Sequence, residues 1–149
     1  YLFGENRISL APVAPDLREL AEGRCFYCGK AVKAKAQIDH LIPFARHIDN
    51  SLSNLVYAHD GCNGKKSSRL AAEPHLEHWM TRITDTTSAG ALKQLATELS
   101  WDYEPDRTLG SARAIYLGLP DGYALWQHAD ELTPIEADRV RAALKVSLV

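Results

Sequence analysis

Two pairs of metal-ligand residues constrain the fold of this 149-residue chain more than any other feature of its sequence. Cys25 and Cys28 form a C-x2-C pair, and His59 and Cys62 form an H-x2-C pair further along the chain. Tetrahedral zinc sites are commonly assembled from two such pairs, each presented from one tight turn. We therefore predict a closed Cys3His zinc site with a structural role. The alternative is three reduced core cysteines beside a surface histidine.

The composition is typical of a globular protein, since 46% of the residues are hydrophobic. No apolar stretch approaches the roughly 18 to 20 residues of a membrane helix, and no charged and then apolar leader opens the sequence. We expect a soluble, cytoplasmic protein without a membrane partner. The first residue is Tyr rather than Met, which favours a piece of a larger polypeptide.

Positive charge is concentrated in one part of the chain, although the whole chain has a net charge of -2. Residues 24–70 hold eight Lys or Arg against three acids, whereas residues 71–149 hold seven against twelve. A phosphate-binding site requires such a local excess of positive charge. A solvated basic face would give the same pattern.

The signals along the chain indicate three segments. Residues 1–23 end in a short amphipathic helix, residues 24–70 carry the zinc pairs, and residues 71–149 have helical signals throughout. The last helix is predicted to begin near Thr133, because Thr133, Pro134 and Glu136 form a capping-box pattern with proline at the first helical position.

The middle segment has the order strand, loop, strand, helix. An apolar run at residues 38–44, IDHLIPF, predicts the first strand, and LVYAH at residues 55–59 predicts the second. A helix follows from Asp60, where the aspartate can act as a cap. His59, Cys62, Asn63 and Lys66 then recur at helical spacing and lie on one face.

The run from residue 38 to residue 70 resembles the HNH endonuclease family, which is built on the ββα-metal fold. The matching positions are Asp39-His40 at the end of the first strand, Pro43, Asn54-Leu55, Cys62-Asn63 and Lys66. With the zinc pairs, the resemblance covers about residues 24–70. It implies an α+β protein with a ββα-metal core and a structural zinc site, followed by an all-helical extension.

The resemblance also implies a role for each matched residue. His40 is expected to be the general base, and Asn54 to brace the loop that orients it. Asp39 and Asn63 are expected to bind Mg²⁺ or Mn²⁺ through oxygen, the ligand that these ions prefer. The residues expected to contact nucleic acid are Lys65, Lys66 and Arg69.

The sequence departs from the family pattern in two places. Asn63 stands where many relatives have His, and His59 stands where Cys is more frequent in the second zinc pair. A geometric condition must also be met, because Asp39 and His40 would point to opposite faces of a regular strand. Both can serve one site only if the strand ends or distorts there, which Pro43 makes plausible.

These features predict a metal-dependent endonuclease that hydrolyses DNA with a water molecule activated by His40. A role in restriction or anti-phage defence follows by analogy with the family, and a larger polypeptide or complex could supply target recognition. The alternatives are a non-catalytic zinc module that binds nucleic acid or protein, with Asp39 and His40 as a structural pair, and a scaffold in which the acidic second half docks a partner.

The remaining histidines and tryptophans have simpler interpretations. His75 and His78 lie beside glutamates without a second ligand pair, which favours a solvated helix face. Trp79, Trp101 and Trp126 are expected to fill the core rather than to stack on bases.

Overall fold

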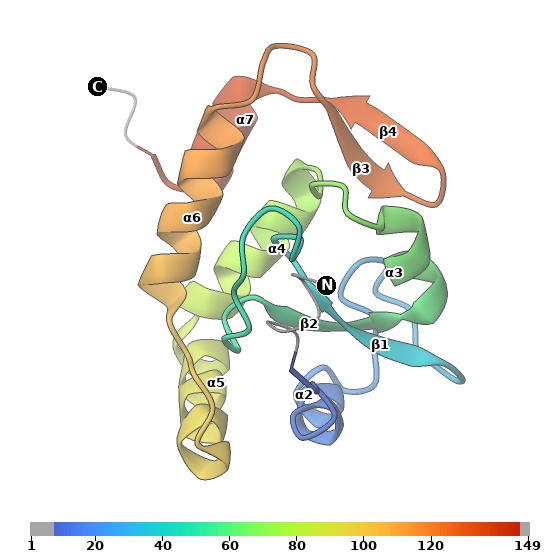
Figure 1. Cartoon of the computed structure of the whole chain (residues 1–149), viewed down its shortest axis with the longest axis vertical. Coiled ribbons are helices and arrows are strands. Elements are labelled where there is room, and N and C mark those ends of the chain that lie inside the picture. Colours follow the sequence, from blue (N-terminus) through green and yellow to red (C-terminus); the bar gives the residue numbers. More distant parts are fainter. Residues whose placement is uncertain (1–7, 147–149) are drawn as a thin grey trace.

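The computed structural model describes residues 8–146, and Figure 1 shows the arrangement of the elements. The fold is α+β, as predicted. In chain order, the elements are α2 (Ala14–Leu20), β1 (Ala36–His40), β2 (Leu55–His59), α3 (Asp60–Lys66), α4 (Glu73–Thr84), α5 (Thr86–Leu99), α6 (Pro105–Leu117), β3 (Ala124–His128), β4 (Glu131–Pro134) and α7 (Ala137–Ala143). Part of the expected N-terminal segment, residues 1–7, lies outside the described residues.

Strands β1 and β2 and helix α3 form the predicted ββα unit. The strands pair antiparallel, with Asp39 opposite Val56 and His40 opposite Leu55. Helix α3 starts directly after β2, and His59 is both the last residue of the strand and the N-cap of the helix. The second zinc pair therefore spans the junction between a strand and a helix.

Helix α4 forms the centre of the hydrophobic core. Its proline lies in the first turn, and the apolar side chains of Leu76, Trp79, Met80 and Ile83 are buried at helical spacing. The indole nitrogen of Trp79 donates a hydrogen bond to the carbonyl of Ser53 over 2.6 Å. This bond joins the helix to the loop that precedes β2.

The segment after residue 70 is not all-helical, which corrects the expectation from the sequence. Strands β3 and β4 form an antiparallel hairpin, seen in Figure 1 on the opposite side of the molecule from α2. Trp126 explains why a strand forms there. Its backbone exchanges hydrogen bonds with the segment around Ala71, through Leu70 O and Ala72 N, while its ring is buried.

The last helix begins later than the capping-box pattern predicts. Thr133 and Pro134 belong to β4, and α7 starts at Ala137. The backbone of Ile135 donates to the carbonyl of Tyr123 over 2.8 Å, so pairing within the hairpin extends past the proline. Tertiary pairing thus outweighs a local helix signal.

The buried side chains form one hydrophobic cluster that draws on elements from α2 to α7. The division into segments at residues 23 and 70 stays a prediction. Within residues 8–146, every helix is too short or too polar to cross a membrane.

Candidate active site and metal-ligand cluster

The four predicted zinc ligands lie together at one point of the fold. The sulfur atoms of Cys25, Cys28 and Cys62 and Nδ1 of His59 all lie within 4.8 Å of one another. Nδ1 of His59 is 3.3 Å from Cys28 Sγ and 3.8 Å from Cys62 Sγ. Tetrahedral zinc, with bonds of about 2.3 Å to sulfur and about 2.0 Å to nitrogen, requires ligand separations of about 3.5 to 3.8 Å. The cluster is compatible with zinc.

His59 is oriented for this cluster by its second ring nitrogen. Nε2 lies 3.1 Å from the carbonyl oxygen of Ala31, to which it can donate, and Nδ1 is then the atom with a free lone pair. Metal-binding histidines are usually fixed in this way by a hydrogen bond to the other nitrogen. The backbone N–H of His59 also donates to Cys25 Sγ over 3.4 Å.

The three thiols are too crowded to ionise together without a cation. Burial and the neighbouring Cys25 and Cys28 raise the pKa of Cys62 to about 12. A bound divalent cation removes this repulsion, because it compensates the thiolates directly. Both the geometry and the chemistry of the donor set therefore fit a metal ion.

Asp39, His40 and Asn63 line a single pocket of about 400 Å³. Asp39 and His40 are the last two residues of β1, and Asn63 comes from the middle of α3. The strand ends at His40, which meets the condition under which two consecutive residues can face one site. The three residues expected to supply the base and the metal ligands thus reach the same cavity.

Asp39 is held by two buried donors. The hydroxyl of Tyr27 donates to Asp39 Oδ2 over 2.5 Å, and Nζ of Lys66 lies 3.3 Å from the same oxygen. Within residues 8–146, these protein contacts involve only Oδ2. Neither Oδ1 of Asp39 nor the side-chain amide of Asn63 makes a hydrogen bond to a described residue.

The structure contradicts the expected phosphate contact of Lys66. Its side chain is 0% exposed, and Nζ bonds Asp39 and the carbonyl oxygen of His40, at 3.1 Å. Burial lowers the pKa of Lys66, while the charge of Asp39 opposes that shift. The helical spacing did place Lys66 on the face that carries Asn63, but that face turns toward the strands instead of toward solvent.

The other two basic residues of this group are exposed. Lys65 forms an ion pair with Asp130 at 2.9 Å, and Arg69 donates to the carbonyl of Lys65 over 3.2 Å. Their contact with nucleic acid stays a prediction.

Asn54 is buried outside the pocket and braces the loop between the strands. Its Oδ1 accepts from Ile42 N over 2.8 Å, and its Nδ2 donates to the carbonyls of Ile42 and Asp49 over 3.2 and 2.9 Å. One side chain thereby ties together both ends of the loop that follows His40.

Two residues of the site were missed by sequence reasoning. Asn50 lines the pocket, and its Oδ1 lies 2.7 Å from His40 Nε2. It sits in a polar loop without any periodic signal. Tyr27 lies between the two cysteines of the first zinc pair, where its position in the turn could have suggested a role.

The prediction of a solvated face is wrong for His75, whereas His78 is exposed. His75 is 6% exposed, stacks on Trp126 and bonds the carbonyl of Gln127 through Nε2 at 2.6 Å. The ring of the exposed His78 stacks on Phe26. The hairpin β3–β4, which the sequence analysis did not foresee, covers His75.

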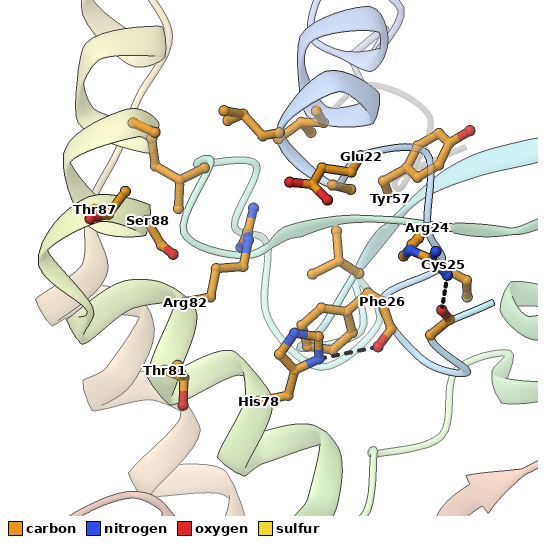
Figure 2. Close-up of a pocket in the computed structure, with 17 residues that line it drawn as sticks. Glu22, Arg24, Cys25, Phe26, Tyr57, His78, Thr81, Arg82, Thr87 and Ser88 are labelled. Atoms are coloured by element: carbon orange, nitrogen blue, oxygen red, sulfur yellow. Dashed lines mark hydrogen bonds between the residues drawn. The ribbon is translucent and has the colours of Figure 1, made fainter. Parts of the chain in front are cut away.

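Figure 2 shows a second pocket, of about 530 Å³, lined by residues of α2, α4 and α5. His78 bonds the carbonyl of Phe26 at its edge, over 3.2 Å. Arg82 donates to the carbonyls of Leu52 and Leu55, so it ties α4 to the start of β2. None of the residues expected to take part in catalysis lines this larger pocket.

The comparisons with known proteins cover the same part of the chain. Residues 25–72 match a family described as HNH endonuclease. No curated protein matches the chain at a significant level. The matched segment holds the zinc-compatible cluster, β1, β2, α3 and the pocket residues Asp39, His40, Asn50 and Asn63.

Proposed function

We propose that this chain, whose residues 25–72 match the HNH endonuclease family, hydrolyses phosphodiester bonds of DNA in a reaction that depends on Mg²⁺ or Mn²⁺. One observation carries the proposal: Asp39, His40 and Asn63 line the same pocket. Phosphodiester hydrolysis needs a group that accepts a proton from water and a cation beside the scissile phosphate. The pocket offers a candidate for the first and ligands for the second.

His40 is the residue suited to accept the proton. An imidazole is partly neutral at cellular pH and can take a proton from an attacking water. Within the described residues, the ring of His40 makes its hydrogen bond through Nε2, so Nδ1 is the nitrogen left for a water molecule in the pocket.

Asp39 and Asn63 would hold the catalytic cation through a carboxylate and an amide oxygen. Such a cation, when bound, neutralises charge that develops on the scissile phosphate and the leaving oxygen. Lys66 and Tyr27 keep the Asp39 carboxylate in place. The hard oxygen ligands favour Mg²⁺ or Mn²⁺ here, whereas the thiols of the Cys3His cluster favour zinc.

We assign the Cys3His cluster a structural role. Four protein ligands leave no open position on a tetrahedral ion. Cys25 and Cys28 flank Tyr27, and Cys62 precedes Asn63, so a zinc ion at this point would fix two elements of the active site relative to each other.

The DNA contacts would come from exposed residues near α3, with Arg69 and Lys65 as candidates. The positive excess of residues 24–70 supports this location. One base and one pair of cation ligands in the pocket favour cleavage of a single strand by each molecule. A role in restriction or anti-phage defence is the biological setting that we propose by analogy.

A non-catalytic zinc module is the second candidate function. It is favoured by the ion pair of Asp39 with Lys66, because a carboxylate satisfied by two buried donors needs no metal for its stability. In that case the pocket would bind nucleic acid or protein without cutting.

A plasmid-nicking assay separates the two functions. We expect nicking with Mg²⁺ or Mn²⁺, loss of nicking in EDTA, and recovery when Mg²⁺ is returned to zinc-loaded protein. Zinc alone should not restore it. Failure of zinc-loaded, folded protein to nick with either ion would favour the binding module.

A further inference from the structure

His40 has a partner that the family resemblance did not supply. Nε2 of His40 lies 2.7 Å from Oδ1 of Asn50. An amide oxygen can only accept, so the hydrogen of this bond belongs to Nε2. A neutral imidazole carries one hydrogen, which leaves Nδ1 with a lone pair. The bond therefore selects one of the two tautomers of His40.

Asn50 itself is held from the second half of the chain. The indole nitrogen of Trp101 donates to the backbone carbonyl of Asn50 over 2.7 Å. Trp101 lies between α5 and α6, outside the family match at residues 25–72. A side chain of the extension thus contacts the residue that bonds the proposed base.

The neighbouring residue anchors the same loop to α6. Asp49 is 1% exposed, and its Oδ2 accepts from the hydroxyl of Thr108 over 2.6 Å. Its Oδ1 accepts from the backbone and the hydroxyl of Ser51, over 3.0 and 2.6 Å. A buried carboxylate with these donors is costly to displace, so the backbone before Asn50 is rigidly placed.

We propose that Asn50 is a positioning residue that keeps neutral His40 in the tautomer with hydrogen on Nε2, and that Trp101 and Thr108 hold Asn50 in place. The catalytic consequence rests on the proposed function, because only a base needs its Nδ1 lone pair free. The tautomer does not rest on it. The extension thereby has a specific task in the active site.

The tautomer can be measured directly in protein labelled with ¹⁵N-histidine. Two-bond ¹H–¹⁵N spectra distinguish protonated from bare ring nitrogens, and His40 is identified from the His40→Ala spectrum. The spectra are recorded at alkaline pH, where imidazoles in general are neutral. We expect hydrogen on Nε2 and a bare Nδ1. Hydrogen on Nδ1 would overturn the proposal.

Three variants test the role of Asn50. Asn50→Leu keeps a similar shape without an acceptor, so the preference for the Nε2 tautomer should fall by about two- to twelvefold, the worth of one neutral hydrogen bond. Asn50→Asp keeps an acceptor and should retain the wild-type tautomer. Asn50→Ala, which also removes the acceptor, replaces Asn50→Leu in this test if the leucine variant does not fold. An unchanged tautomer in a folded Asn50→Leu or Asn50→Ala protein contradicts the proposal.

A matched pair of tryptophan variants tests the link to the extension. Trp101→Phe removes the N–H that bonds Asn50, whereas Trp126→Phe removes an N–H that bonds Ala129 at 3.0 Å. We expect mixed tautomers of His40 only in Trp101→Phe. An equal effect of both variants, or no effect of Trp101→Phe, would refute the link.

Nuclease activity gives the second readout. In Asn50→Leu, kcat should fall by about tenfold or more while KM and the Mg²⁺ requirement stay unchanged, and Asn50→Asp should restore part of kcat. A changed tautomer with unchanged kcat would refute the positioning role. If wild-type protein does not cut DNA at all, the proposed function fails, while the tautomer measurement still decides whether Asn50 fixes His40.

Discussion

Tyr27 donates its hydroxyl hydrogen to Asp39 Oδ2 over 2.5 Å, and this bond joins the zinc-compatible turn to the proposed catalytic site. Tyr27 lies between Cys25 and Cys28, while Asp39 is on β1. Burial and the negative charge of Asp39 raise the pKa of Tyr27, which keeps the hydroxyl protonated as a donor. The turn that would bind zinc therefore also orients a proposed ligand of the catalytic cation.

Tyr27→Phe should weaken the binding of the catalytic cation without unfolding the protein. Residues that orient metal ligands typically contribute 10- to 100-fold to metal affinity. We expect the Mg²⁺ concentration for half-maximal nicking to rise by about tenfold, with zinc content unchanged. Tyr57→Phe is the control, because its hydroxyl has no hydrogen bond to a described residue. Equal Mg²⁺ requirements in the two variants would contradict this role.

Lys66 should support the fold rather than bind DNA. Removal of one partner from a buried ion pair typically costs about 3 to 5 kcal/mol, so Lys66→Met should lower the free energy of unfolding by about 3 kcal/mol or more. The salt dependence of DNA binding should not change.

Arg69→Ala provides the contrast to Lys66→Met. One lost phosphate contact reduces the slope of log K against log salt by about 0.9. Fluorescence anisotropy across a salt series measures both slopes. A reduced slope for folded Lys66→Met would show that Lys66 contacts a phosphate after all.

Thr108→Val should make the protein more sensitive to acid. Burial raises the pKa of Asp49, but hydrogen bonds from Ser51 and Thr108 and the charge of Arg107 lower it by more, to below its ordinary value. Folding therefore favours the ionised form. This stabilisation is complete above the ordinary aspartate pKa of about 3.9 and is lost as the pH falls through the folded-state value.

Loss of the Thr108 donor should raise the folded-state pKa of Asp49 and move acid unfolding to higher pH. At neutral pH we expect a loss of about 1.5 to 3 kcal/mol in chemical denaturation. Thr97→Val is the control, because the hydroxyl of Thr97 donates to the carbonyl of Lys93 on an exposed helix face. Identical acid midpoints for the two variants would show that Thr108 does not stabilise the Asp49 carboxylate.

Purified protein should contain about one zinc ion per chain. Elemental analysis after dialysis measures the content, and Cys62→Ser should lose zinc and melt at a lower temperature because metal binding contributes to folding. A strong chelator should unfold the wild type, and zinc, unlike Mg²⁺, should restore it. A folded wild-type sample without stoichiometric zinc would refute the zinc assignment.

The elements that could be predicted are those with local signals. The zinc pairs and the ββα order depend on spacings of a few residues, and the structure brings Cys25 and His59 together as those spacings indicated. The apolar face of α4 follows from helical periodicity in the same way.

The elements that could not be predicted depend on contacts between distant residues. Trp126 forms a strand because it pairs with the backbone near Ala71. Lys66 is buried because its ammonium group pairs with Asp39 and lies over the ring of Tyr27. A helical spacing cannot reveal these contacts. Asn50 is placed by Trp101, far along the chain.

The central claim is that His40 serves chemistry while the zinc-compatible cluster serves the fold. Asn63→Ala provides the comparison, since it removes a proposed cation ligand without exposing a buried partner. Asp39→Ala is less suitable, because it would leave Lys66 buried without its carboxylate. His47→Ala is the control, since His47 belongs to the same loop and does not line the pocket.

The most direct measurement is the nicking rate of His40→Ala at low and high Mg²⁺. Zinc content and melting temperature are measured in the same samples. We predict normal zinc content, a melting temperature within a few degrees of wild type, and cleavage reduced by about 100-fold or more. High Mg²⁺ should partly rescue Asn63→Ala and never His40→Ala. Cleavage by His40→Ala at the wild-type rate, or unfolding of that variant, would contradict the account.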